Sequence, residues 1–365
     1  MRHLAECLTT CPHQRSQPTR YTFVGLDGLR GVAAIAVAVG HLNNVLGVDR
    51  HLTNSALAVD FFFMLSGFVL AHAYGGKLAR GRWFIPFLIA RVIRLYPLIL
   101  VGALVGASAY LMRGTDAGYL GRLLFQSILL VPEIKYSNID PSVFPINPPA
   151  WSLLFEVIAS ILFGLGVWRV HLLGPLLLFS AAALFSTVIS YQTFDVGWSP
   201  DLLWSGLIRV MFGMGAGIFL YRVHCRGSAR ILPLHIGIAG STLVLILSGV
   251  FSSVAFQMAS VFLFFPLIIL GSARASNRWI GACKWFGELS YPLYIIHWPV
   301  YLWIGFAIAS TSLPIRDSVL GGISLITAII TSLMVLRLYD QPVRRWLTKR
   351  ARLLQFLPFE RFGAP

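Results

Sequence analysis

The sequence predicts an all-α protein, a polytopic transmembrane helical bundle of about ten spans with both termini in the cytoplasm. Its composition, the length of its apolar runs and the positions of its Lys and Arg residues support this prediction. Of the 365 residues, 57% are hydrophobic and 12% are charged. Soluble proteins carry about 25% charged residues. This composition therefore excludes a water-soluble enzyme, a disordered protein and a nucleic-acid-binding domain.

The apolar runs define the spans. A helix needs about 20 mainly apolar residues to cross the hydrocarbon core of a bilayer. The runs close to this length are 28–47, 56–74, 90–112, 150–168, 171–190, 202–221, 232–250, 253–271, 288–309 and 317–338. A further run, 118–131, is too short and has charged flanks, so we expect a re-entrant or surface helix there.

The basic residues orient these spans, because cytoplasmic loops of membrane proteins retain Lys and Arg. With 118–131 left out of the membrane, the cytoplasmic side receives Arg2, Arg15, Arg20, Lys77, Arg80, Arg82, Arg169, Arg222, Arg226, Arg230, Arg274, Arg278, Lys284 and the basic residues from Arg337 onward. Arg113 and Arg122 are the exceptions on the outer side. The net charge of +15 thus reflects membrane topology rather than nucleic-acid binding.

The chain is expected to form one membrane domain, residues 25–345. A cytoplasmic N-terminal tail, 1–24, has no apolar segment of a cleavable signal peptide, and a basic cytoplasmic tail, 346–365, follows the domain. The longest irregular segment, 132–149, is rich in Pro and is expected on the outer side. Loops of this length are usually functional or disordered.

Ionisable residues within the spans are the main functional signal, because each costs about 2.5–3.5 kcal/mol at the centre of a bilayer. They are Arg30, His41, Asp60, Arg91, Arg94, Glu156, Arg209 and His297. Arg30 and His41 are eleven residues apart, so they share one helix face over about 16 Å. An imidazole is well suited to take a proton from a hydroxyl near neutral pH. A snorkelling Arg30 and a helix-end His41 are the structural alternatives.

Arg91 and Arg94 lie one turn apart at a cytoplasmic helix end, where two guanidinium groups can grip phosphate oxygens or simply anchor the span. Asp60 and Glu156 are expected near the depth of His41, which either carboxylate could orient. Asp60 could equally be a helix-start aspartate. Arg209 could be the partner of a buried carboxylate.

Aromatic and polar residues suggest a substrate cavity. Trp151 is either an interfacial belt residue or a wall on which a sugar ring can stack. Ser290, Tyr294 and His297 share a helix face, where they line a cavity or join helices by hydrogen bonds. A Gly-rich phosphate loop, an HExxH motif and a GxSxG elbow are all absent from the sequence, so hydrolases and nucleotide triphosphatases lack support. No metal site is expected.

Several motifs together resemble the acyltransferase 3 family of bacterial membrane enzymes, which O-acylate O-antigens, exopolysaccharides and other acceptors. The matching segments are Leu26-Asp27-Gly28-Leu29-Arg30-Gly31 with His41, Val59-Asp60-Phe61-Phe62-Phe63 with Ser66-Gly67-Phe68, Arg91-x-x-Arg94-Leu95-Tyr96-Pro97, Trp151-Ser152-Leu153 with Glu156, and Ser290-Tyr291 with Tyr294 and His297. They occur in the family's order over about residues 22–345.

The resemblance implies a multi-pass O-acyltransferase of the bacterial inner membrane. Acyl-CoA, with acetyl-CoA as the expected form, would be a co-substrate rather than a tightly bound cofactor. Its phosphates would be held by Arg91, Arg94 and Arg30. The acceptor would be a hydroxyl of an extracytoplasmic glycan or glycolipid. His41 would act as general base, polarised by Glu156 or Asp60, or would carry an acyl intermediate.

The resemblance also implies that Trp151, Ser290, Tyr294 and His297 contribute to substrate binding. Membrane lipids are the other expected partners, and no nucleic acid is expected. A secondary transporter of a small polar solute, with Arg30, Glu156 and His297 as a relay, is the alternative. Transporters often contain two matching halves, and none is visible here. A non-catalytic scaffold of a polysaccharide export complex is a third possibility.

Overall fold

The computed structural model describes residues 23–48, 52–79, 83–168, 170–226, 234–273, 279–309 and 316–354, and within these ranges it contains helices and no strand. The α-helices are α2 (Val24–Leu46), α3 (Leu57–Ala79), α4 (Phe84–Met112), α5 (Ala117–Leu129), α6 (Ala150–Gly164), α7 (Val170–Tyr191), α8 (Leu203–Arg226), α9 (Ile236–Ser248), α10 (Val254–Ala259), α11 (Phe265–Ser272), α12 (Ile280–Ala309), α13 (Asp317–Val335) and α14 (Gln341–Leu353). A 3₁₀ turn, η2 (Pro200–Leu202), precedes α8. Two π-helical segments, η3 (Ser260–Phe264) and η4 (Leu336–Asp340), join α10 to α11 and α13 to α14.

The helices confirm a multi-pass membrane bundle. Among the described residues, 8 helical segments are long and apolar enough to cross a membrane, and α10–α11 and α13–α14 each count as one of them. Two further predicted spans form the shorter apolar helices α6 and α9. All ten predicted apolar runs are therefore helical, but two of these helices are shorter than a full crossing. α5 has 13 residues, which agrees with its exclusion from the spans.

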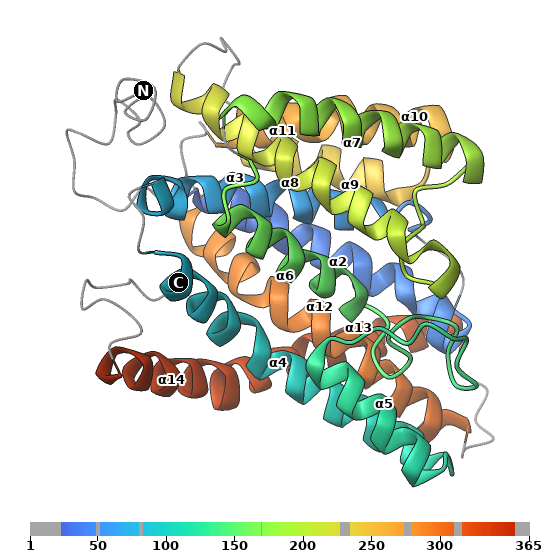
Figure 1. The fold of residues 1–365 in the computed structure, drawn as a ribbon. Helices are drawn as coiled ribbons and strands as arrows, with labels where there is room; N and C mark the ends of the chain where they lie inside the picture. Colours follow the sequence, from blue (N-terminus) through green and yellow to red (C-terminus); the bar gives the residue numbers. More distant parts are fainter. Residues whose placement is uncertain are drawn as a thin grey trace.

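Parts of the predicted topology fall outside the described residues. These parts are the N-terminal tail up to residue 22, the C-terminal residues 355–365, and Arg80, Arg82, Arg169, Arg230, Arg274 and Arg278. The first residues of the predicted C-terminal tail belong to α14, which continues as a helix to Leu353. In Figure 1, α14 and α5 lie at opposite ends of the bundle.

The Pro-rich segment enters the bundle before α6 begins, although the sequence places all of it outside. Residues 142–153 are buried. The amide of Asn147 donates a hydrogen bond to the Ile295 carbonyl at 3.1 Å. Irregular backbone at membrane depth is tolerated where protein surrounds it. α6 is short because its first turn already lies inside the protein.

Glycines allow two pairs of parallel helices to pack closely. A Cβ atom on Gly31 of α2 would lie 2.5 Å from the Phe286 Cβ of α12. A Cβ atom on Gly217 of α8 would lie 2.0 Å from the Met64 carbonyl oxygen of α3. Small residues at helix interfaces permit such approach in membranes. α2 and α12 therefore run side by side in one direction (Figure 1), which aligns their polar residues.

Candidate functional site

Two histidines meet where α2 packs against α12. The Nδ1 atom of His41 lies 2.8 Å from the Nε2 atom of His297. Their ring planes are nearly parallel, with 6° between them and 5.1 Å between the ring centroids. The Nδ1 atom of His297 lies 2.8 Å from the carbonyl oxygen of Leu293, one turn earlier in α12. The two rings and the carbonyl therefore form one continuous hydrogen-bonded chain.

This chain assigns the protons. The Leu293 carbonyl can only accept, so Nδ1 of His297 carries a hydrogen and, in the neutral ring, Nε2 of His297 accepts. Nδ1 of His41 must then donate to it. The lone pair of a neutral His41 is consequently on Nε2, which is the nitrogen that can take a proton from a substrate.

Aromatic rings hold this pair in place. The indole of Trp298 meets the His41 ring edge-on, with 5.2 Å between centroids. Tyr301 packs against the His297 ring and donates a hydrogen bond to the Ala38 carbonyl of α2 at 3.2 Å. His297 is fully buried, whereas His41 retains partial exposure. His41 is therefore the more exposed residue of the pair.

A second cluster lies toward the start of α2. Arg30, Arg91 and Arg94 all attract the carboxylate of Glu156 on α6. Arg91 forms an ion pair with Glu156, and the Ser66 hydroxyl donates to the same carboxylate at 3.0 Å. Among the described residues, Arg30 and Arg94 form no hydrogen bond or ion pair, and the buried Nε of Arg91 has no partner. These guanidinium groups retain capacity to bind an anion.

The border of this arginine cluster contains both signs of charge. Asp27 of α2 interacts with Arg30 and Arg94. Asp340 forms an ion pair with Arg344 at 3.0 Å, and both lie within electrostatic reach of Arg94. The cluster and its border together hold four guanidinium groups and three carboxylates, so the positive excess is small. Its ability to bind an anion depends on the unpaired donors rather than on a large net charge.

The structure separates both predicted carboxylates from His41. Glu156 lies with the arginines because α6 begins inside the bundle, so a residue in its second turn is deeper than the sequence suggests. Asp60 pairs with Arg209 of α8, which donates from Nε at 3.1 Å and from Nη2 at 2.7 Å. Arg209 thus has the carboxylate partner expected for it. The described contacts of His41 come from α12 and include neither carboxylate.

Arg209 organises the contact between α3 and α8. It also donates to the carbonyls of Val196 at 2.7 Å and Ala56 at 3.0 Å, and it is fully buried. Its guanidinium lies 5.2 Å from the ring centroid of Trp151, which is 7% exposed. Trp151 is therefore a buried packing partner of Arg209, not an interfacial belt residue.

The remaining predicted residues lie on the face of α12 that meets α6. The hydroxyls of Tyr294 and Ser152 are 2.7 Å apart, which joins the two helices. Ser290 donates to the Gly287 carbonyl of its own helix at 2.7 Å. Their part in substrate binding remains a prediction. The ring contacts of Trp298 and Tyr301 were not predicted, although Trp298 directly follows His297 and Tyr301 lies one turn after it.

Comparison with known proteins identifies the family of this arrangement. A family model described as an acyltransferase domain matches residues 23–338. The chain belongs to the acyltransferase 3 family. It is also similar to "Protein 2 in picA locus" of Rhizobium radiobacter, with 38% identity over 162 residues that cover 40% of this chain and 82% of that protein. No solved structure matches the chain.

The family match places this protein among membrane acyltransferases, and the matched region extends from α2 into η4. It contains the histidine pair and the arginine cluster. The described part of the chain has no group of three or more His, Cys, Asp or Glu residues placed to hold a metal ion.

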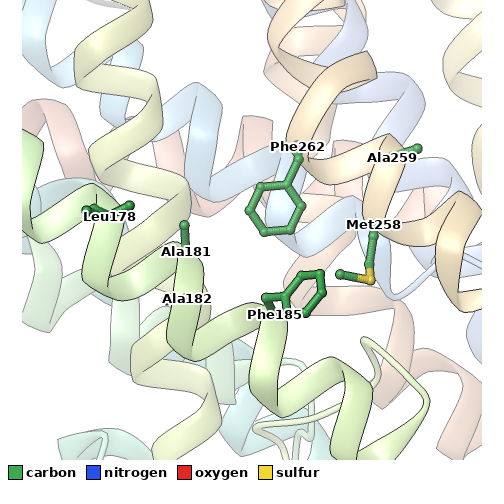
Figure 2. Close-up of a pocket in the computed structure, with 7 residues that line it drawn as sticks. All are labelled: Leu178, Ala181, Ala182, Phe185, Met258, Ala259 and Phe262. Atoms are coloured by element: carbon green, nitrogen blue, oxygen red, sulfur yellow. The ribbon is translucent and has the colours of Figure 1, made fainter.

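An apolar pocket elsewhere in this acyltransferase is lined by apolar side chains alone. It has a volume of about 480 Å³ and is lined by Leu178, Ala181, Ala182, Phe185, Met258, Ala259 and Phe262. Figure 2 shows Phe185, Met258 and Phe262 around the space between α7 and the α10–η3 segment. Since Phe185 is 54% exposed, this pocket lies on the apolar surface of the bundle.

The Asp60–Arg209 pair predicts a double-mutant result. Removing one partner of a buried ion pair costs about 3–5 kcal/mol, because the other charge is left uncompensated. We expect Arg209→Met and Asp60→Leu each to lower the thermal unfolding midpoint strongly, and the double variant to recover much of the loss. Size-exclusion chromatography of heated detergent extracts measures this. Additive losses would show that the pair has no structural role.

Proposed function

We propose that this acyltransferase moves an acyl group, with acetyl as the preferred form, from acyl-CoA on the cytoplasmic side to a hydroxyl of an extracytoplasmic glycan or glycolipid. We place it in a bacterial inner membrane. The observation that carries the proposal is the alignment of two clusters on α2. Arg30 and His41 are separated by about 16 Å along this helix, with anion-binding groups at one end and a free imidazole nitrogen at the other.

The proposed binding of acyl-CoA is supported by guanidinium groups that have no hydrogen-bond partner among the described residues. Acyl-CoA carries phosphates, and guanidinium groups bind phosphate oxygens in bidentate geometry. Arg30 and Arg94 are available for this contact. Arg91 is held in place by Glu156, so Glu156 has a positioning role rather than a role in proton transfer.

The proposed activation of the acceptor hydroxyl is supported by the lone pair on Nε2 of His41. In the proposed step, this nitrogen takes the proton of the acceptor hydroxyl while the hydroxyl oxygen attacks the thioester carbonyl. The carbon–sulfur bond then breaks, and the CoA thiolate receives the proton from His41. The hydrogen bond to His297 stabilises the imidazolium that His41 forms during the reaction. The sequence analysis had assigned this role to the carboxylate of Asp60 or Glu156. The rings packed around His41 favour a small acyl group.

Replacement of the base tests the chemistry. We expect His41→Ala to reduce acyl transfer by about 10²–10⁴-fold, the usual contribution of a general base. Acyl-CoA binding should stay within about twofold of wild type, because the arginine cluster is intact. Radiolabelled transfer in membranes and equilibrium binding to purified protein measure the two effects. Undiminished transfer by a correctly inserted variant would contradict this role of His41.

Replacement of His297 tests the proton assignment. His297→Leu removes the hydrogen-bond acceptor that fixes the tautomer of His41. We therefore expect kcat to fall by about tenfold or more, with an unchanged KM for acyl-CoA. Gln can present a carbonyl oxygen to Nδ1 of His41 and should restore part of the rate. A purely structural role of His297 predicts reduced folded protein and the same kcat per folded molecule.

Replacement of Arg94 tests the donor site. A hydrogen bond to a charged group contributes about 1.5–3 kcal/mol, so we expect Arg94→Ala to weaken acyl-CoA binding by about 10–100-fold. Arg345 of α14 is exposed and contacts the backbone of its own helix. Arg345→Ala is therefore the matched loss of one positive charge and should change binding little. Equal effects of the two variants would exclude a specific donor contact.

A further inference from the structure

We propose that a polar pocket between α5 and the segment after it binds a sugar unit of the acceptor glycan. The pocket has a volume of about 370 Å³ and is lined by Tyr119, Arg122, Glu133, Ile134, Lys135, Tyr136 and Asn138. Ligand pockets usually measure about 300–1,000 Å³. This inference rests on the proposed function, because it names where that reaction holds its acceptor.

The side chains of the pocket suit a carbohydrate. Sugar rings present C–H groups on their faces and hydroxyls around their edges. Tyr119 and Tyr136 supply aromatic surfaces that also carry a polar group. Arg122, Glu133 and Asn138 supply planar groups that can donate to or accept from neighbouring hydroxyls. A hydrophobic ligand would make no use of these polar groups, and a small anion would make no use of the rings.

Contacts between the lining residues hold the pocket in shape. Arg122 forms an ion pair with Glu133, and its guanidinium lies 5.3 Å from the ring centroid of Tyr119. The hydroxyl of Tyr119 lies 2.8 Å from Ser137 Oγ. The backbone N–H of Lys135 donates to Glu133 at 3.3 Å. The lining is therefore formed before any ligand binds, which reduces the entropic cost of binding.

The pocket is also tied to the outer end of α8. Tyr136 donates a hydrogen bond to Asp201 of η2. This hydrogen bond, with the nearby charge of Asp201, raises the pKa of the Tyr136 phenol. Tyr136 is nevertheless 56% exposed. Its ring is thus held in position and remains accessible to a ligand.

A small apolar cluster connects the side of this pocket to the surroundings of His41. The adjacent face of α5 buries Leu120 and Leu123 in a small apolar cluster that also contains Trp298 and Leu302, and Tyr119 of the pocket packs against this cluster. Trp298 is the residue whose ring contacts His41. A sugar bound at α5 would therefore lie on the outer side of the same packing unit that supports the base. An interfacial tyrosine belt would not require charged groups converging on one cavity.

The test measures acyl transfer as a function of acceptor concentration. The full-length protein in liposomes receives labelled acetyl-CoA and the envelope glycan and glycolipid fraction of cells that lack the gene. We expect Tyr119→Ala and Asn138→Ala to raise the acceptor KM by about tenfold, with unchanged KM for acetyl-CoA and unchanged kcat. Tyr191 at the end of α7 is 47% exposed, and Tyr191→Ala is the matched control.

The outcomes of this test distinguish a failure of the pocket proposal from a failure of the proposed function. An unchanged acceptor KM in Tyr119→Ala and Asn138→Ala would overturn the pocket and leave the proposed function standing. A wild-type protein that binds acetyl-CoA but acylates nothing in the envelope fraction would overturn the proposed function itself. Asn138 is exposed, so Asn138→Ala should fold normally and decides the question if Tyr119→Ala does not fold.

Discussion

Close packing of α2 against α12 is the constraint on which the site depends. The two helices approach through glycines: a Cβ atom on Gly28 would lie 2.8 Å from Cys283 Sγ, and one on Gly31 would overlap Phe286. Because the helices are parallel, this contact extends over their length and brings His41 beside His297. Without it, the imidazole of His41 would have no partner to select its tautomer. The glycines of α2 therefore permit the helix contact that pairs the two histidines.

Burial of charge divides the polar residues of the bundle into two groups. Arg209 satisfies its donors with Asp60 and two carbonyls, so it stabilises the packing of α3 against α8. Arg30 and Arg94 form no such hydrogen bonds among the described residues, yet they too lie in an apolar bundle. Unpaired guanidinium groups are costly in such surroundings. The cost is accounted for if a negatively charged substrate occupies that end of the site.

The buried Pro-rich segment connects the α5 pocket to the arginine cluster. It starts at the α5 pocket, passes between α4 and α12, and leads into α6, which carries Glu156 to the arginines. A single stretch of chain thus contributes to both proposed substrate sites. Because this segment is buried, Glu156 of α6 lies deeper in the bundle than the sequence suggests. An extracellular loop and a membrane helix of full length would not produce this arrangement.

The sequence by itself determined the helical membrane class, the ten apolar runs and the family, because hydropathy and charge are local properties of the chain. It also showed which ionisable residues lie within the spans, among them Arg30, His41, Arg91 and Arg94. It also suggested that Arg209 would pair with a carboxylate. Only the tertiary structure decided which carboxylate that is, and that His41 meets His297 rather than Asp60 or Glu156. These partnerships depend on the depth at which each helix starts and on which faces meet. Neither is encoded in the periodicity of a single helix.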